Sequence, residues 1–156
     1  METNIGITQK NRQAVTLEMS KLLADEFILY TKTRNAHWNV EGADFHAMHL
    51  FFEAQYEQLD EIMDSVAERI RAIGHYAPAT LKSYLKLTHL TEFGEDRNGS
   101  LDFIQELLSD HESIIEFIRS KITLFASTYK DLGTSDYITG LMETHEKMAW
   151  MLRSHL

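Results

Sequence analysis

Four stretches of this chain repeat apolar residues at intervals of three and four, and this period constrains the fold more than any other feature. Such a period is typical of α-helices that bury one face. One proline and seven glycines in 156 residues leave the stretches almost uninterrupted. We therefore expect an all-α fold with four amphipathic helices. Their apolar positions are Val15, Met19, Leu22 and Leu29; Phe45, Met48, Phe52, Tyr56, Leu59, Met63, Val66 and Ile70; Leu101, Ile104, Leu108, Ile115, Ile118 and Ile122; and Ile138, Leu141, Met148 and Leu152.

The connections between these stretches predict how the helices are arranged. Residues 39–43 contain Gly42 and read as a short turn, and Asp44 suits the N-cap of the second helix, so the first two helices should be antiparallel neighbours. The longer connection over 74–99 contains Pro78, and we expect a short helix in it near residues 81–86. A four-helix bundle with one long crossover between helices two and three is the ferritin-like arrangement. We expect a single domain over 1–156, with a short N-terminal tail over 1–10.

Composition narrows the classes of function. The chain has no cysteine, so thiolate metal sites and cysteine nucleophiles are excluded. The formal net charge of −9 opposes binding to phosphate backbones and favours the concentration of cations. The start of the chain has no apolar signal segment, and no run is long enough to span a bilayer, so we expect a cytoplasmic protein without a membrane partner.

Histidines and carboxylates gather along one strip of the second predicted helix. Each residue turns by about 100° around the helix axis. Measured from His49, the angular position of Glu53 is near 40°, that of Asp64 near 60° and that of Glu68 near 100°. His37 lies close to His49 across the short turn. Yet fifteen residues of helix separate His49 from Asp64 by roughly 22 Å, whereas metal to ligand bonds are roughly 2 Å long. One chain therefore cannot place both groups on the same ion.

A second copy of the chain would complete the site. An antiparallel copy of the helix, crossing near Gln58 on a two-fold axis, sets His49 and Glu53 of one subunit opposite Asp64 and Glu68 of the other. Symmetry then produces two equal sites. A homo-oligomer is therefore expected.

The ligand types leave two classes of function open. Imidazole and carboxylate without thiolate suit iron(II), and zinc or manganese are alternative metals. The strip therefore indicates either a redox site for iron or an assembly whose interface holds zinc or another redox-inert metal. The alternative is that the strip binds no metal and is only a solvated acidic face, because further polar residues of undefined role lie on or near it. These are His46, Glu57, Asp60 and Glu61.

Other candidate sites are weaker. An iron site inside the bundle needs Glu-x-x-His motifs, and no histidine has a glutamate three residues before it. His111 and His145 each lie on an apolar stripe, and we interpret them as hydrogen-bonded core residues. Trp38 follows His37 directly, which suggests either packing or an electron-relay role beside a redox metal.

The segment KTRNAHWNVEG over 32–42, then Phe45 and His49, and the segment DSVAERI over 64–70 resemble the signature of the Dps family, the mini-ferritins. The resemblance extends over nearly the whole chain. It implies a hollow shell of twelve subunits that oxidises iron(II), preferably with hydrogen peroxide, stores the ferric product and protects against oxidative stress. It also implies that His37 and His49 bind iron from one subunit, and Asp64 and Glu68 from its partner.

The resemblance carries three further expectations. Glu53 stands where many members have aspartate, so its carboxylate reaches one methylene further, and it is the fifth expected ligand. Asp131 and Asp136 match the place of acidic entry pores, although helix N-termini also favour such acids. Family members often bind DNA through a basic tail, and this chain has only Lys10 and Arg12 near its start. Weak or absent DNA binding is therefore expected.

Overall fold

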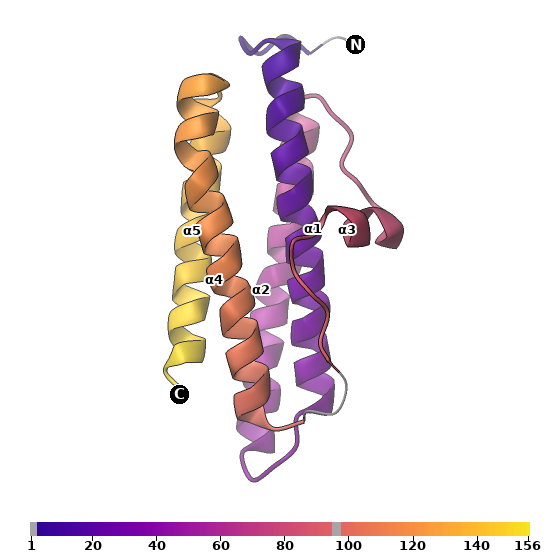
Figure 1. Ribbon diagram of the computed structural model, residues 1–156, viewed down its shortest axis with the longest axis vertical. Coiled ribbons are helices and arrows are strands. Elements are labelled where there is room, and N and C mark those ends of the chain that lie inside the picture. The colour runs from indigo at the N-terminus through magenta and orange to yellow at the C-terminus, as the bar shows by residue number, and fades with distance from the viewer. Residues whose placement is uncertain (1–2, 95–97) are drawn as a thin grey trace.

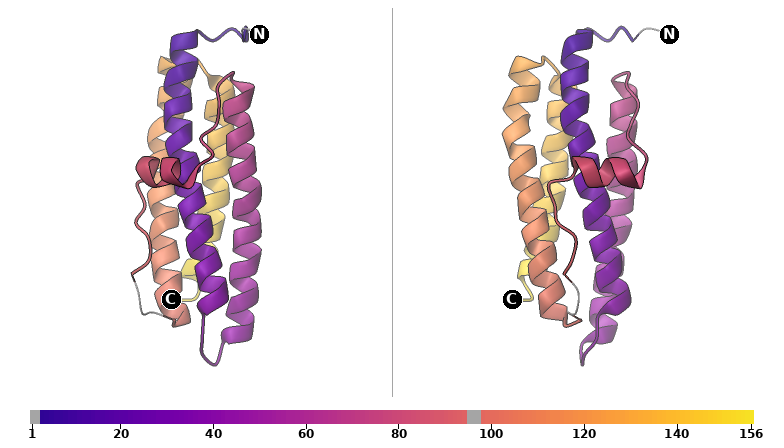
Figure 2. Two further views of the ribbon diagram at one scale, coloured as in Figure 1. Left: turned by 90° about the vertical axis from the view of Figure 1, so that its right-hand side faces the viewer. Right: turned by 45° about the vertical axis from the view of Figure 1, so that its right-hand side comes forward.

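The computed structural model describes residues 3–94 and 98–156, and it places four long helices side by side in one bundle (Figure 1). α1 (Gln9–Asn39) and α2 (Phe45–Ala72) form one antiparallel pair, and α4 (Ser100–Thr123) and α5 (Leu132–Arg153) form the other. The connection from α2 to α4 runs back along the bundle and carries the short α3 (Leu81–Leu87), which crosses the outside of α1 (Figure 2). The predicted ferritin-like arrangement with one long crossover is confirmed, including the short helix.

The two ends of α2 show why the chain turns where it does. The turn after α1 passes through Gly42, whose φ of 132° lies in the region that side chains disfavour. At the other end Gly74 has a φ of 93°, and the amides of Gly74 and His75 donate to the carbonyls of Arg71 and Ile70. These two hydrogen bonds close the last turn of the helix at a glycine.

Asp44 occupies the predicted N-cap position of α2, but its side chain makes no capping hydrogen bond. Its backbone, at φ −98° and ψ 9°, does not have the extended conformation of a usual cap. The carboxylate instead accepts a hydrogen bond of 2.6 Å from the Ser100 hydroxyl at the start of α4. The Glu41 amide donates to the Asn98 carbonyl beside it. The turn between α1 and α2 is therefore fastened to the second helix pair.

Buried polar groups fasten the crossover to α1. The Lys32 ammonium donates to the Thr91 carbonyl, and the Asp25 carboxylate accepts from the Thr88 hydroxyl and the His89 amide, each within 2.8 Å. Both Lys32 and Asp25 are buried, so these bonds replace the water that the charged groups lose. The crossover thereby acquires a fixed path along the bundle.

The end of the third amphipathic stretch differs from a regular helix. After α4 the chain forms one π-helical turn, η1 (Leu124–Thr128), in which the Tyr129 amide donates to the Leu124 carbonyl. Phe125 is buried in this turn, so the wider winding keeps its ring in the core. Within the described ranges, no helix is both long enough and apolar enough to cross a membrane.

Candidate functional site: a histidine pair at the end of the bundle

The turn between α1 and α2 brings His37 and His49 together. His37 lies in the last turn of α1 and His49 near the start of α2. Their rings stack with centroids 3.8 Å apart and an interplanar angle of 21°. His37 is buried and His49 is half-buried. The proximity that the sequence predicts for this pair is therefore present within a single chain.

Two reciprocal hydrogen bonds determine which ring nitrogens carry protons. His37 Nδ1 lies 2.8 Å from the His49 carbonyl oxygen, and His49 Nδ1 lies 2.8 Å from the His37 carbonyl oxygen. A carbonyl oxygen only accepts, so each Nδ1 must carry the hydrogen. In the neutral rings each Nε2 then has a free lone pair. Such Nδ1 to carbonyl bonds are the usual support of histidines that bind metal through Nε2.

Glu53 lies one helical turn beyond His49 on α2, beside a residue that the motif analysis missed. The Tyr56 hydroxyl donates to Glu53 Oε1 at 3.3 Å. The Tyr56 ring meets the His37 ring edge-on, with centroids 5.1 Å apart. Burial, followed by the neighbouring Glu53 carboxylate, raises the pKa of Tyr56 above its usual value. The three-residue spacing of Glu53 and Tyr56 is the sequence signal that would have found it.

Arg34 is the second residue that the motif analysis missed. Its guanidinium carbon lies 4.3 Å from the ring centroid of Tyr56, 5.0 Å from that of Trp38 and 5.7 Å from that of Tyr30. Trp38 is 63% exposed. The Trp38 side chain is thus turned outward, and Tyr56 rather than Trp38 adds an aromatic contact to the stacked His37 and His49 rings.

Asp64 and Glu68 lie farther along α2 and are exposed. Because α2 is continuous from Phe45 to Ala72, the separation of roughly 22 Å between His49 and Asp64 follows from the helical rise. In the part of the chain that the structure describes, no three His, Asp or Glu side chains converge on a point where they could hold a metal ion. The structure of one chain joins His37 to His49 and leaves the two acids apart from them.

Asp64 borders an open groove of about 420 Å³ on the side of the bundle that carries α3. Asp60 lies on the same groove, with Leu23, Phe27 and Tyr84 among the apolar residues that line it. Leu23 is buried at the floor of this groove, and Phe27 and Tyr84 are half-buried.

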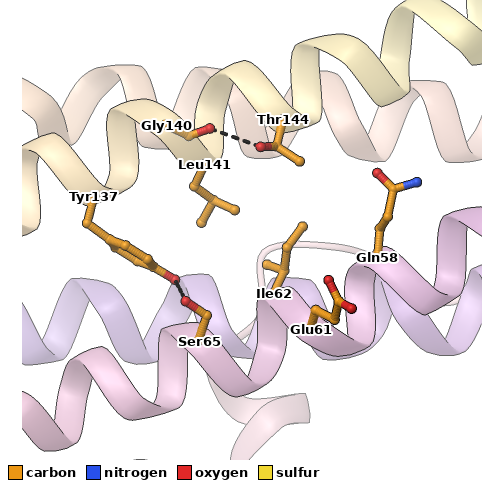
Figure 3. Close-up of a pocket in the computed structure, with 8 residues that line it drawn as sticks. All are labelled: Gln58, Glu61, Ile62, Ser65, Tyr137, Gly140, Leu141 and Thr144. Carbon is orange, nitrogen blue, oxygen red and sulfur yellow. Dashed lines mark hydrogen bonds between the residues drawn. The ribbon is translucent and has the colours of Figure 1, made fainter.

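A second groove, of about 440 Å³, lies between α2 and α5 and holds none of the candidate ligands (Figure 3). Its walls are joined by the Tyr137 hydroxyl, which donates to Ser65 Oγ at 2.9 Å, or accepts from it. Glu61 is the acidic residue among those that line it.

The two candidate pore acids have different environments. Asp131 is buried; it accepts from the Thr134 amide at 2.9 Å and from the Thr134 hydroxyl at 2.6 Å, and it pairs with Arg69 at 3.3 Å. These contacts match the alternative interpretation, an acid at a helix N-terminus, and they leave the carboxylate inside the bundle. Asp136 is exposed. Asp136 is thus the candidate that remains available to line an entry pore.

His111 and His145 are core residues, as the sequence predicts. Both are fully buried, their Nδ1 atoms lie 2.9 Å apart, and His145 Nε2 lies 2.9 Å from the buried Glu26 carboxylate. Burial, and then the neighbouring His145, hold the pKa of His111 well below its usual value. These groups join α1, α4 and α5 at the centre of the bundle, away from the His37 and His49 pair.

Comparison with known proteins supplies the family context. Residues 17–156 match the model of the ferritin-like domain. The chain is 39% identical over 153 residues to an uncharacterized low temperature-induced protein of Nostoc, covering 98% of this chain and 86% of that protein. It is 34% identical to DNA protection during starvation protein 2 of Bacillus anthracis, covering 94% and 98% of the two chains. The crystal structure of a Dps protein from Vibrio cholerae, described as a member of a superfamily of ferritin-like diiron-carboxylate proteins, superposes with a TM-score of 0.90 at 28% identity, covering 99% and 96%.

Proposed function

Because the chain belongs to the Dps family of ferritin-like proteins, we propose that it oxidises iron(II) with hydrogen peroxide at sites shared between two subunits. The family supports iron storage and protection against oxidative stress as its general role. The specific reaction, its oxidant and its ligands are the proposal. Iron is the substrate in this scheme, and its ferric product is stored inside a closed shell, for which we propose twelve subunits.

The histidine pair is the observation that carries the proposal. Two Nε2 lone pairs are fixed beside each other because both Nδ1 hydrogens are donated to backbone carbonyls. A ligand whose orientation is fixed before the metal arrives loses little conformational freedom on binding. Glu53 would add a carboxylate one turn along the same face, held by the Tyr56 hydroxyl. One subunit thus offers two nitrogens and one carboxylate.

We propose that the partner subunit supplies the remaining ligands, Asp64 and Glu68. Two copies of α2 that cross antiparallel near Gln58 pair His49 with Glu68 and Glu53 with Asp64. The two members of each pair lie equally far along the helix on either side of the crossing point, so the antiparallel copy brings them opposite each other. The groove beside Asp64 offers the apolar surface that such an interface would cover. Two equivalent sites would then form at each two-fold axis.

The ligand set supports redox chemistry without an internal cofactor. Mixed imidazole and carboxylate ligands suit iron(II) and leave positions open for an oxidant. Reduction of peroxide by two electrons at such a site yields water rather than hydroxyl radical. The net charge of −9 would favour the entry and retention of cations.

The experiment is a peroxide titration of the assembled protein in the presence of iron(II). We expect peroxide to be consumed in proportion to added iron(II), and faster than in buffer. A His37→Ala/Asp64→Ala variant should lose this acceleration, because each site then lacks a ligand from both subunits. His155→Ala is the matched control, since this exposed histidine contacts Phe51 rather than the pair.

Size-exclusion chromatography must show that all three proteins assemble alike. The proposal is contradicted if the assembled wild-type protein fails to accelerate iron oxidation, or if the double variant matches it. Tight zinc binding without iron oxidation would favour the redox-inert assembly that the ligand types also permit.

A further inference from the structure

Among the contacts of the described residues, Tyr56 is the one redox-active side chain that touches two proposed ligands, Glu53 and His37. Its hydroxyl donates to Glu53 Oε1 at 3.3 Å, and its ring meets the edge of the His37 ring. The phenol therefore has a carboxylate base for its proton and an aromatic contact with a metal-binding imidazole. The contact is made inside one subunit, so it exists before any partner packs against the site.

Charge distinguishes Tyr56 from the neighbouring tryptophan. Loss of an electron leaves an indole with a positive charge, whereas a phenol that also loses its proton becomes a neutral radical. The Arg34 guanidinium lies 5.0 Å from the Trp38 ring, so a positive charge on that indole would be repelled. Tyr56 has the same cation 4.3 Å away, but its proton has Glu53 as an acceptor and no net charge need develop on its ring.

We propose that Tyr56 donates one electron to peroxide when a single iron(II) occupies the site, an inference that rests on the proposed function. Iron(II) gives one electron and becomes iron(III), and the phenol gives the other and becomes a neutral phenoxyl radical. Together the two electrons break the O–O bond of hydrogen peroxide. The two oxygens leave as two waters after taking up two protons, the phenolic proton by way of Glu53 and one from solvent. A half-filled site thereby avoids the release of hydroxyl radical.

The test is rapid freeze-quench electron paramagnetic resonance on the assembled protein. Samples receive less than one iron(II) per site and then one equivalent of peroxide. We expect a tyrosyl signal whose hyperfine pattern changes when the protein carries ring-deuterated tyrosine. Tyr56→Phe, which keeps the ring and removes the hydroxyl, should lose the signal, and a spin trap should then capture more hydroxyl radical than with the wild-type protein.

Two matched variants separate Tyr56 from its neighbours. Tyr30→Phe removes another phenol, whose ring lies 6.2 Å from that of Tyr56, and Trp38→Phe removes the indole. Both should keep the tyrosyl signal. The inference is overturned if Tyr56→Phe retains the radical, if the signal in wild type belongs to Trp38, or if iron(II) is oxidised by peroxide with no protein radical at all. Absence of any accelerated iron oxidation would instead refute the proposed function, and this inference with it.

Discussion

At the scale of single residues, the environment assigns two histidine pairs to different roles. His37 and His49 donate from Nδ1 to backbone carbonyls near the end of the bundle, which leaves both Nε2 atoms available. His111 and His145 bond to each other through Nδ1 in the fully buried core. The same side chain thus forms a structural link in the core, and in the function proposed above it is a prearranged ligand at the end of the bundle.

The buried pair predicts how stability changes with pH. The pKa of His111 is lowered in the folded state, so below about pH 6.5 the unfolded chain takes up a proton that the folded chain excludes. The contribution of His111 to stability is therefore complete at higher pH and is lost as the pH falls below that value. We expect the thermal unfolding midpoint, followed by circular dichroism at fixed protein concentration, to fall from pH 7.5 to pH 5.5.

The variant His111→Phe isolates this effect. It should lower overall stability by roughly 1–3 kcal/mol, because His145 Nδ1 loses its hydrogen-bond partner while Nε2 keeps its contact with Glu26. Its unfolding midpoint should nevertheless change less between the two pH values than that of the wild-type protein. If the unfolding midpoints of the two proteins depend equally on pH, His111 does not exclude a proton in the folded state.

At the scale of elements, the amphipathic period predicts the long helices, and the short helix of the crossover is found where it was expected. Local signals carry this information, because apolar spacing, glycine turns and caps act within a few residues. The π-helical turn at Leu124–Thr128 has no such local signal and depends on the burial of Phe125. The reciprocal bonds of the histidine pair and the Tyr56 contacts were likewise not predicted, since they depend on ring orientations that only the packed helices determine. The separation of His49 from Asp64, in contrast, follows from the helical rise alone and is predictable from the sequence.

A buried ion pair joins α1 to α4, and its contribution to stability can be tested separately. Lys32 contacts Asp110 on α4, and burial, opposed by Lys32, raises the pKa of Asp110 to about 6. At pH 7.5 the carboxylate is charged, so Lys32→Met would leave it buried without a counter-charge. We expect this variant to lose roughly 3–5 kcal/mol of unfolding free energy.

A double variant checks the interpretation. Lys32→Met/Asp110→Leu removes both charges, and we expect it to recover most of the stability that the single variant loses. The measurement is thermal unfolding of the assembled proteins at pH 7.5. If the double variant is no more stable than Lys32→Met alone, the loss comes from the missing Lys32 contacts to the crossover and not from the unpaired carboxylate.

At the scale of the whole molecule, one chain contributes three of the five proposed ligands to one site and the other two to the symmetry-related site. His49 lies near the start of α2 with His37 of α1 beside it, and the acids lie toward the other end of α2, so a two-fold axis near the midpoint of α2 is the symmetry that unites them. The net charge of −9 fits a surface that attracts iron and opposes binding to phosphate backbones. Function in this account is a property of paired subunits.

Complementation between two inactive variants tests the shared site most directly. One variant is His37→Ala/His49→Ala and the other is Asp64→Ala/Glu68→Ala, and each alone should fail to accelerate iron oxidation by peroxide. When the two are disassembled, mixed equally and reassembled, half of the interfaces pair unlike subunits, and each such interface contains one intact site. The account predicts recovery of about a quarter of the wild-type rate. No recovery in a mixed assembly of proven composition would contradict it.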